Sequence, residues 1–264
     1  MRQINSAFVL LGALMIISRP MDELARGRGL LPRLGRAART GAVAGCFVFL
    51  FAVVAFAQVA QAQEDRRQNA PGGFDFYVLS LSWSPSYCEA SAERASGRAP
   101  EMQCAGRPFA FVVHGLWPQY DKGFPSYCKV PAPRLNRAIV GAMLDLMPSP
   151  RLIYHEWDRH GTCSGLSPNA YFENVRKARS VVKIPDSYIE RDRPGLVTPG
   201  EVTEAFIKAN PGLSNDQIAV TCDSKRLSEV RVCLTKDFSF RDCPETARRS
   251  CRRDKVAMPA VRGG

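Results

Sequence analysis

The stretch His155-Glu156-Trp157-Asp158-Arg159-His160-Gly161-Thr162-Cys163 contains two of the three histidines in the chain. If this stretch is helical, each residue is rotated by about 100° from the one before. The two imidazoles, the Glu156 carboxylate and the Arg159 guanidinium then share one face, whereas Trp157 points away from it and is expected in the core. This face combines a proton acceptor, a proton donor and a permanent cation, which suits phosphoryl chemistry.

The third histidine, His114, lies in Phe111-Val112-Val113-His114-Gly115-Leu116-Trp117-Pro118-Gln119. The residues 108–113 are rich in Phe and Val, and they predict a strand that ends at His114 and is followed by a turn. A single histidine at the end of a buried strand is often a core residue. Histidines confined to two short segments instead indicate chemistry, because an imidazole titrates near pH ~6.5 and two of them can divide base and acid roles.

The formal net charge is +11, and part of it belongs to the first segment. Residues 1–62 hold seven arginines against two acids, a balance of +5, so the remaining residues carry +6. This moderate positive charge is compatible with a polyanionic ligand, and equally with a basic, soluble surface. Charge alone therefore does not decide the ligand.

The first 62 residues have the features of an export signal. Arginines up to Arg39 precede a long apolar run, 41–59, which ends in Ala60-Gln61-Ala62. This order predicts a secretory signal that is cleaved after Ala62, followed by a polar linker, 63–73. The basic region is unusually long, which is consistent with a true start further downstream, and a retained membrane anchor is the alternative.

Eight of the nine cysteines follow this segment, at positions 88, 104, 128, 163, 222, 233, 243 and 251. An even number downstream of an export signal predicts four disulfides and an oxidising compartment, periplasmic or extracellular. The spacing alone leaves their pairing open. No pair has C-x-x-C spacing, which argues against a thiol-redox site and a zinc finger.

The remaining pattern mixes strands and helices without regular alternation. Strands are predicted at 74–83, 108–113, 217–222 and 227–235, and helices at 134–147, around the opening stretch, from Ser167 to about 182, and from Thr198 to 210. Residues 85–107 are predicted to form a loop held by its two cysteines, and 252–264 a loose basic tail. We expect a single α+β domain over 74–251, with an antiparallel sheet, packed helices and disulfide staples.

The two histidine segments resemble the catalytic segments of the ribonuclease T2 family, the secreted endoribonucleases that include the plant S-RNases. The segment Leu79-Ser80-Leu81-Ser82-Trp83-Ser84-Pro85 also resembles the first core strand of that family. The similarity runs from about residue 74 to 251. It implies an α+β fold and cleavage of single-stranded RNA through a 2′,3′-cyclic phosphate, with no metal and no other cofactor. The disulfides that it implies are Cys88–Cys104, Cys128–Cys163, Cys222–Cys251 and Cys233–Cys243.

The resemblance also implies roles for the histidine segments. His160 would take the proton from the ribose 2′-hydroxyl, and His114 would protonate the departing 5′-oxygen. Glu156 and Arg159 would stabilise the pentacovalent phosphorus, and His155 would hold the phosphate. Many members of the family have lysine where this chain has Arg159, so the positive charge is kept but the contact geometry differs.

Trp117 and Gln119 are the expected base-binding residues. Trp117 would stack on a base, as aromatic rings do with unpaired nucleotides. Some members of the family have an acid at the position of Gln119. An amide both donates and accepts hydrogen bonds, so the base preference is not carried over. Tyr120, Phe124 and Tyr127 are candidates for a second stacking ring.

Two other classes of protein would account for some of these residues. A zinc peptidase would have H-E-x-x-H, whereas His155 and His160 are five positions apart; a metal-dependent hydrolase that uses all three histidines would lose activity on chelation. A catalytically silent RNA-binding or inhibitory protein on the same scaffold would need no paired proton donor and acceptor. We therefore expect a monomeric enzyme that acts on single-stranded RNA, leaves DNA intact and has no stable association with the membrane after signal cleavage.

Overall fold

The structure, a computed structural model, describes residues 70–94 and 102–261. The predicted signal in 1–62, its cleavage after Ala62 and most of the linker 63–73 lie outside the described residues. Within the described part of the chain, no helix combines the length and the apolar character that a membrane span requires.

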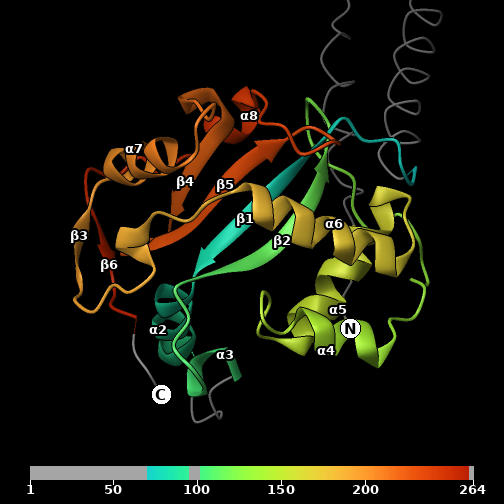
Figure 1. The fold of residues 1–264 in the computed structure, drawn as a ribbon, viewed down its shortest axis with the longest axis horizontal. Coiled ribbons are helices and arrows are strands. Elements are labelled where there is room, and N and C mark those ends of the chain that lie inside the picture. The colour runs from blue at the N-terminus through green and yellow to red at the C-terminus, as the bar shows by residue number, and fades with distance from the viewer. Residues whose placement is uncertain (1–69, 95–101, 262–264) are drawn as a thin grey trace, which may run out of the picture. The chain divides into compact units, whose positions relative to one another are not determined.

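A four-stranded sheet forms the centre of the fold (Figure 1). Its strands lie in the order β2 (Phe111–Gln119), β1 (Phe76–Trp83), β5 (Leu227–Leu234) and β4 (Ile218–Cys222). Every neighbouring pair is antiparallel. The predicted α+β class with an antiparallel sheet is confirmed.

The helices of the described residues are α2 (Ser84–Arg94), α3 (Met102–Ala105), α4 (Arg137–Met143), α5 (Pro150–Arg159), α6 (Pro168–Val181), α7 (Pro199–Ala209) and α8 (Pro244–Ala247). Several of them begin at the caps that their sequences predict. Ser167 caps α6, and Thr198 and Glu201 form the capping box of α7. Ser149 caps α5, the helix that carries most of the opening stretch.

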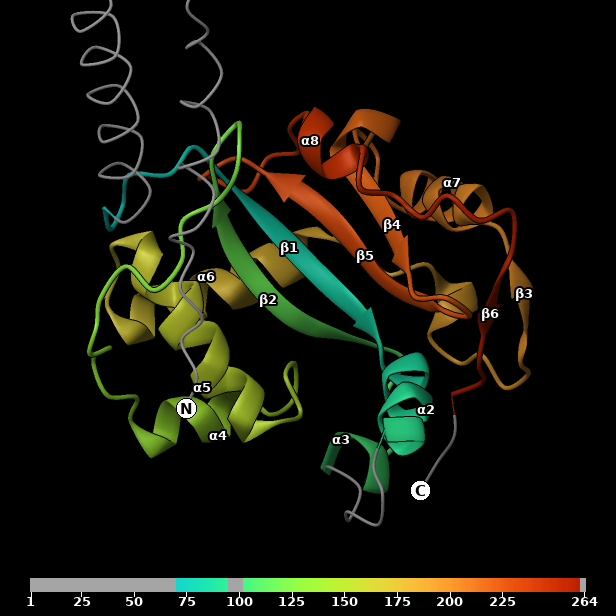
Figure 2. The ribbon, with the colours of Figure 1, turned by 180° about the vertical axis from the view of Figure 1, so that it is seen from behind.

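The hydrophobic core lies on one face of the four-stranded sheet. Alternate residues of the strands point to this face, for example Leu79 and Leu81 of β1 and Val230 and Val232 of β5, all of them buried. Helix α6 covers this face: it crosses in front of the sheet in Figure 1 and behind it in Figure 2. Trp157 of α5 belongs to the same core cluster, as predicted.

The predicted loop 85–107 contains α2 and α3 instead. Its serine-rich composition favours a loop, but Pro85 occupies the first turn of α2, where proline is tolerated because its missing N–H has no helical partner there. The Cys88–Cys104 disulfide then joins α2 to α3. Near the end of α2, Glu93 accepts two hydrogen bonds from Arg226, at 2.9 and 2.8 Å. Tertiary contacts thus override a weak local pattern.

The prediction of a loose tail over 252–264 is wrong for its described part. Residues Val256–Met258 form β6, which pairs with β3 (Gly195–Val197) in a second, small antiparallel sheet. Both ends of β6 are buried, and the carbonyl of Pro259 accepts a hydrogen bond of 3.0 Å from the indole N–H of Trp83. Basic residues before β6 mask a short apolar strand whose alternate residues enter the core.

Four disulfides connect the elements, in the pairing that the family resemblance implied. They are Cys88–Cys104, Cys128–Cys163, Cys222–Cys251 and Cys233–Cys243. The Cys128–Cys163 bond ties the segment before α4 to the 3₁₀ turn η1 (Gly161–Ser164), which follows α5 directly. The Cys233–Cys243 bond ties β5 to the start of α8. Disulfides therefore hold one element on each side of the cavity described below.

Removing residues 252–264 from the mature chain is expected to lower the free energy of unfolding by about 4 kcal/mol or more. The deletion removes two buried side chains of β6, each worth roughly 1.5–3 kcal/mol, and leaves the Trp83 N–H without its partner, at about 1–3 kcal/mol. Urea unfolding followed by tryptophan fluorescence measures the change. A chain that lacks only residues 262–264 is the matched control, and equal unfolding midpoints for the two truncations would contradict this account of β6.

Candidate active site

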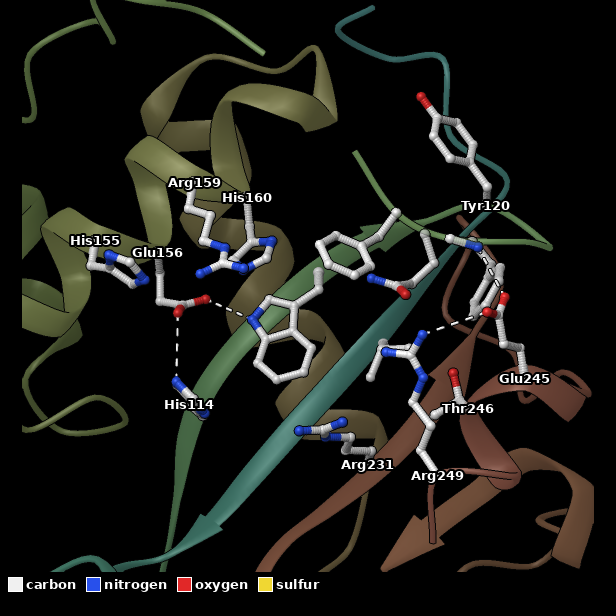
Figure 3. A pocket seen from close by; sticks show the side chains of 16 residues that line it. His114, Tyr120, His155, Glu156, Arg159, His160, Arg231, Glu245, Thr246 and Arg249 are labelled. Atoms are coloured by element: carbon white, nitrogen blue, oxygen red, sulfur yellow. Dashed lines mark hydrogen bonds and ion pairs between the residues drawn. The ribbon is translucent and has the colours of Figure 1, made fainter. Parts of the chain in front are cut away.

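A cavity of about 350 Å³ opens on the face of the sheet that points away from the core (Figure 3). Strands β1, β2 and β5 line it, with α5 on one side and α8 on the other. Every catalytic, phosphate-binding or base-binding residue expected from the sequence lines this cavity: His114, Trp117, Gln119, His155, Glu156, Arg159 and His160. Segments far apart in the sequence thus meet around one volume.

His114 lies in a β-bulge in the middle of β2. Gly115 and Val113 pair with adjacent residues of β1, so His114 is an extra residue with no partner across this strand pair. In a regular strand, residues three positions apart point to opposite faces. The bulge turns His114 and Trp117 to the same side, where their ring centroids are 5.3 Å apart.

The strand therefore does not end at His114, as predicted, but continues to Gln119. Gly115 and Pro118 are turn-forming residues, and they favour the wrong boundary. Both are tolerated here because β2 is an edge strand, where proline need not remove a ladder hydrogen bond, and because glycine often accompanies a bulge.

A hydrogen bond between Trp117 and Glu156 joins β2 to α5. The indole N–H donates to Oε2 of the carboxylate at 2.7 Å. A Cβ atom on Gly115 would overlap with both partners, so the close approach requires glycine at this position. The other oxygen, Oε1, lies 3.7 Å from Nε2 of His114. Burial raises the pKa of Glu156 to about 7, although the charge of His114 and the Trp117 N–H act in the opposite direction.

His160 follows the last residue of α5, and its ring is enclosed by the cavity. The residue is 7% exposed, and its ring centroid is 5.4 Å from that of Trp117. Burial lowers the pKa of His160 to about 3, and the positive charges of Arg159, His114 and His155 act in the same direction. The imidazole is therefore neutral at mildly acidic pH and can accept a proton.

His114 has a different environment. Its Nδ1 is hydrogen-bonded to Oε1 of Glu229 on β5, and its Nε2 faces Glu156. Burial lowers the pKa of His114, but the hydrogen bond to Glu229 and the charges of Glu229 and Glu156 outweigh burial and the nearby Arg231, so the pKa is raised above its ordinary value. The His114 imidazole is therefore protonated at mildly acidic pH, where His160 is neutral.

His155 and Arg159 lie on the same side of the cavity as Glu156. His155 is exposed, and its pKa is lowered by partial burial and then by the charge of Arg159. The guanidinium of Arg159 lies 6.0 Å from the ring centre of Tyr127, whose N–H donates to the Arg159 carbonyl at 2.8 Å. Tyr127 thus packs against Arg159 and is not among the residues that line the cavity.

The opposite half of the cavity is lined by the end of β2, the segment that follows it, and α8. Tyr120 and Phe124, the two remaining candidates for a second ring, both line this half. The side-chain amide of Gln119 donates a hydrogen bond from Nε2 to the carbonyl oxygen of Pro118 at 3.0 Å. Glu245 of α8 accepts the N–H of Gly123 at 2.9 Å, which holds the segment that carries Phe124 against α8.

Several residues of the site have no counterpart in the sequence predictions: Arg231, Glu245, Thr246 and Arg249, which line the cavity, and Glu229, which contacts His114. The guanidinium of Arg231 lies 5.1 Å from the ring centre of Trp117. The sequence contains one signal for Glu229 and Arg231. They interrupt the apolar pattern of residues 227–235 at alternate positions, so they place two charges on one face of a buried strand. The α8 residues have no such local signal.

The cavity can support proton transfer next to a bound anion. Its lining brings together a protonated imidazole, a neutral imidazole, a buried acid and an arginine. Such a set can move protons and stabilise developing negative charge. In residues 70–94 and 102–261, no group of three or more His, Cys, Asp or Glu side chains is arranged to hold a metal ion.

Residues 74–243 match the family model of the ribonuclease T2 family. A ribonuclease of Aeromonas hydrophila is 45% identical over 170 residues, which cover 63% of this chain and 74% of that relative. A Haemophilus influenzae protein named "Probable ribonuclease" is 30% identical over 185 residues, 67% of this chain, and the match spans 63% of that relative's length. The solved structure of an RNase-related protein from Calystegia sepium has the same fold, with a TM-score of 0.55 and 20% identity over 72% of this chain and 98% of that one. The family match includes both histidine segments, and this chain therefore belongs to the ribonuclease T2 family.

Proposed function

We propose that the chain is an endoribonuclease that cleaves single-stranded RNA in this cavity by transesterification, with a 2′,3′-cyclic phosphate as the first product and without a metal ion. The family acts on RNA. The observation that carries the proposal is that His114 and His160 line one cavity in opposite environments. The hydrogen bond from His114 to Glu229 outweighs burial and raises the pKa of His114, whereas His160 is buried beside positive charges, which lowers its pKa. Environments that push two titratable groups apart are characteristic of a general acid and a general base.

The two histidines move the protons of the reaction. Neutral His160 takes the proton of the ribose 2′-hydroxyl, and the 2′-oxygen forms a bond to phosphorus. The bond from phosphorus to the 5′-oxygen breaks as His114 donates the proton of Nε2 to that oxygen. Water then opens the cyclic phosphate with the two histidines in exchanged roles, which returns both to their starting forms.

Glu156, Arg159 and His155 stabilise the phosphorane. Burial raises the pKa of Glu156 to about 7, so the side chain is largely the neutral acid at mildly acidic pH. A neutral acid can donate a hydrogen bond to a phosphoryl oxygen and avoids the repulsion that a carboxylate would exert on it. Arg159 supplies a fixed positive charge, and His155, on the same face of α5, contacts the phosphate from outside.

One base of the substrate stacks on Trp117, next to Gln119. The indole is fixed in orientation by its N–H bond to Glu156 at 2.7 Å, so its ring presents a preformed surface to an unpaired base. Phe124 is 37% exposed and Tyr120 is 6% exposed. Phe124 therefore has more ring surface to offer as the second stacking group.

We also propose that the enzyme acts in an oxidising compartment outside the cytoplasm. Members of the family are commonly secreted, and disulfides such as the four of this chain form in oxidising compartments. We assign residues 1–62 to a leader that is cleaved after Ala62, 63–73 to a linker, and residue 74 onward to the catalytic domain. The mature enzyme is a periplasmic or extracellular monomer without stable membrane association. DNA is not a substrate, because it lacks the 2′-hydroxyl.

Replacing either His114 or His160 with alanine is expected to lower kcat by about 100-fold or more, because a proton-transfer group contributes roughly 10²–10⁴-fold. Binding of RNA should change little, and His155→Ala, which removes the third imidazole that lines the cavity, should have the smaller effect. The oxidised chain 63–264 is incubated with single-stranded RNA and with DNA of the same sequence in EDTA, and the ends are identified.

The wild-type chain should produce 2′,3′-cyclic ends on RNA and leave the DNA intact. Near-normal turnover in His114→Ala or His160→Ala would rule out the paired acid and base. Activity that disappears on chelation would favour a metal-dependent hydrolase, and RNA binding without cleavage would favour a catalytically silent protein.

The pH dependence of kcat/KM should show activity well into the acidic range. His160 must be neutral, and with a pKa of about 3 it stays neutral far below the ordinary value near ~6.5. His114 must be charged, and its raised pKa keeps it charged above that ordinary value. At about pH 5 the activity should be near its maximum, whereas a base with the ordinary pKa would lose about 30-fold there. An acidic limb centred near ~6.5 would contradict the assignment of His160.

A further inference from the structure

Glu229 lies on the face of the sheet that points away from the core, and both oxygens of its carboxylate have hydrogen-bond partners. Glu229 lies on β5 opposite Ser82 of β1, and it is 8% exposed. Oε1 is hydrogen-bonded to Nδ1 of His114. Oε2 accepts two hydrogen bonds from Arg231, from Nε at 2.9 Å and from Nη2 at 2.6 Å. The side chain therefore has little freedom to turn away from the imidazole.

This arrangement determines which nitrogen of His114 faces the substrate. A carboxylate only accepts hydrogen bonds, so it keeps the proton on Nδ1 and leaves Nε2 to point into the cavity. Nε2 is the atom that faces Glu156 across the cavity, at 3.7 Å from Oε1. The bulge at His114 places the ring at the cavity, and the contact with Glu229 fixes its rotation.

Arg231 connects this contact to the base-binding side. Two of its nitrogens hold Glu229, and its guanidinium lies 5.1 Å from the ring centre of Trp117. Two charge-assisted hydrogen bonds from one guanidinium restrain the carboxylate of Glu229 more than a single hydrogen bond would. The ring that would stack on a base and the acid that would protonate the leaving group are thus supported by one pair of residues on β5.

We infer that Glu229 is the positioning residue of the general acid: it orients His114 through Nδ1 and stabilises its charged form, and Arg231 keeps Glu229 in place. The inference rests on the proposed function, in which His114 protonates the 5′-oxygen. It adds two residues that lie outside both histidine segments.

The other charges around His114 determine how far its pKa should fall when Glu229 is replaced. From β5, Glu229 raises the pKa of His114 and Arg231 lowers it, and from α5, Glu156 raises it. His155 on α5 and His160, which follows α5, also interact with His114 and have lowered pKa values in turn. Glu156 remains in a Glu229 variant, so the pKa of His114 should fall but the imidazole should still titrate.

The test compares Glu229→Gln with Glu93→Gln. Glu93 also pairs with an arginine, Arg226, but it does not line the cavity and does not contact His114. Glu229→Gln should lower kcat about 10- to 100-fold, a partial loss of a proton-transfer contribution, with KM within about threefold. The alkaline limb of its pH profile should move down by about one pH unit, equivalent to about 1.4 kcal/mol. Glu93→Gln should keep the wild-type profile.

Products and profile separate this inference from the proposed function. A fluorogenic single-stranded oligoribonucleotide of mixed sequence reports the rates, and end analysis identifies the products. If the wild-type chain makes no cyclic ends, the proposed function fails and the inference with it. If the wild-type chain makes them and Glu229→Gln keeps the wild-type kcat and alkaline limb, only the positioning role is overturned.

A second measurement does not depend on the folding of a variant. The chain has three histidines, so their ring nitrogens can be resolved and assigned in ¹⁵N spectra of the wild-type protein. His114 should carry a proton on Nδ1 on both sides of its titration, with a downfield proton resonance typical of a hydrogen bond to a carboxylate. A neutral His114 with its proton on Nε2 would overturn the inference.

Discussion

One hydrogen bond, from the indole N–H of Trp117 to the carboxyl group of Glu156, joins the two histidine segments of the site. Trp117 belongs to β2 and Glu156 to α5, so the bond relates the strand that carries His114 to the helix that ends next to His160. Because Glu156 is buried, loss of this partner would leave a polar group unsatisfied in the interior. The bond also requires a residue without a Cβ atom at position 115, because a side chain there would overlap with both partners. In the short motif around His114, Gly115 and Trp117 are therefore both needed for this bond.

The cavity gives two identical side chains opposite protonation states. Burial alone disfavours the charged form of an imidazole, and His160 follows this rule. His114 departs from it because Glu229 contacts its Nδ1. Glu229 stays ionised in turn, with its pKa lowered to about 2, because burial is outweighed by His114 and Arg231. The division between acid and base thus depends on strand β5 as much as on the two histidine segments.

The helical part of the site could be predicted from the sequence because the helical period is regular. The residues expected on one helical face all reach the cavity, although α5 itself ends at Arg159, and Trp157 enters the core. The bulge at His114 could not be predicted, because one extra residue inverts the alternation of a strand without changing its composition. The contact between His114 and Glu229 joins residues 115 positions apart, which no local pattern relates. The disulfide pairing followed only from the family resemblance, since the spacing of the cysteines left it open.

A crystal structure with a dinucleotide that lacks the attacking 2′-hydroxyl, and so cannot be cleaved, tests the central claim most directly. The account predicts that the phosphate lies between the two imidazoles. Nε2 of His114 should be within about 2.6–3.2 Å of the 5′-oxygen, and His160 should face the C2′ carbon on the other side. A phosphate that contacts only one of these imidazoles, or that binds elsewhere in the cavity, would contradict the account.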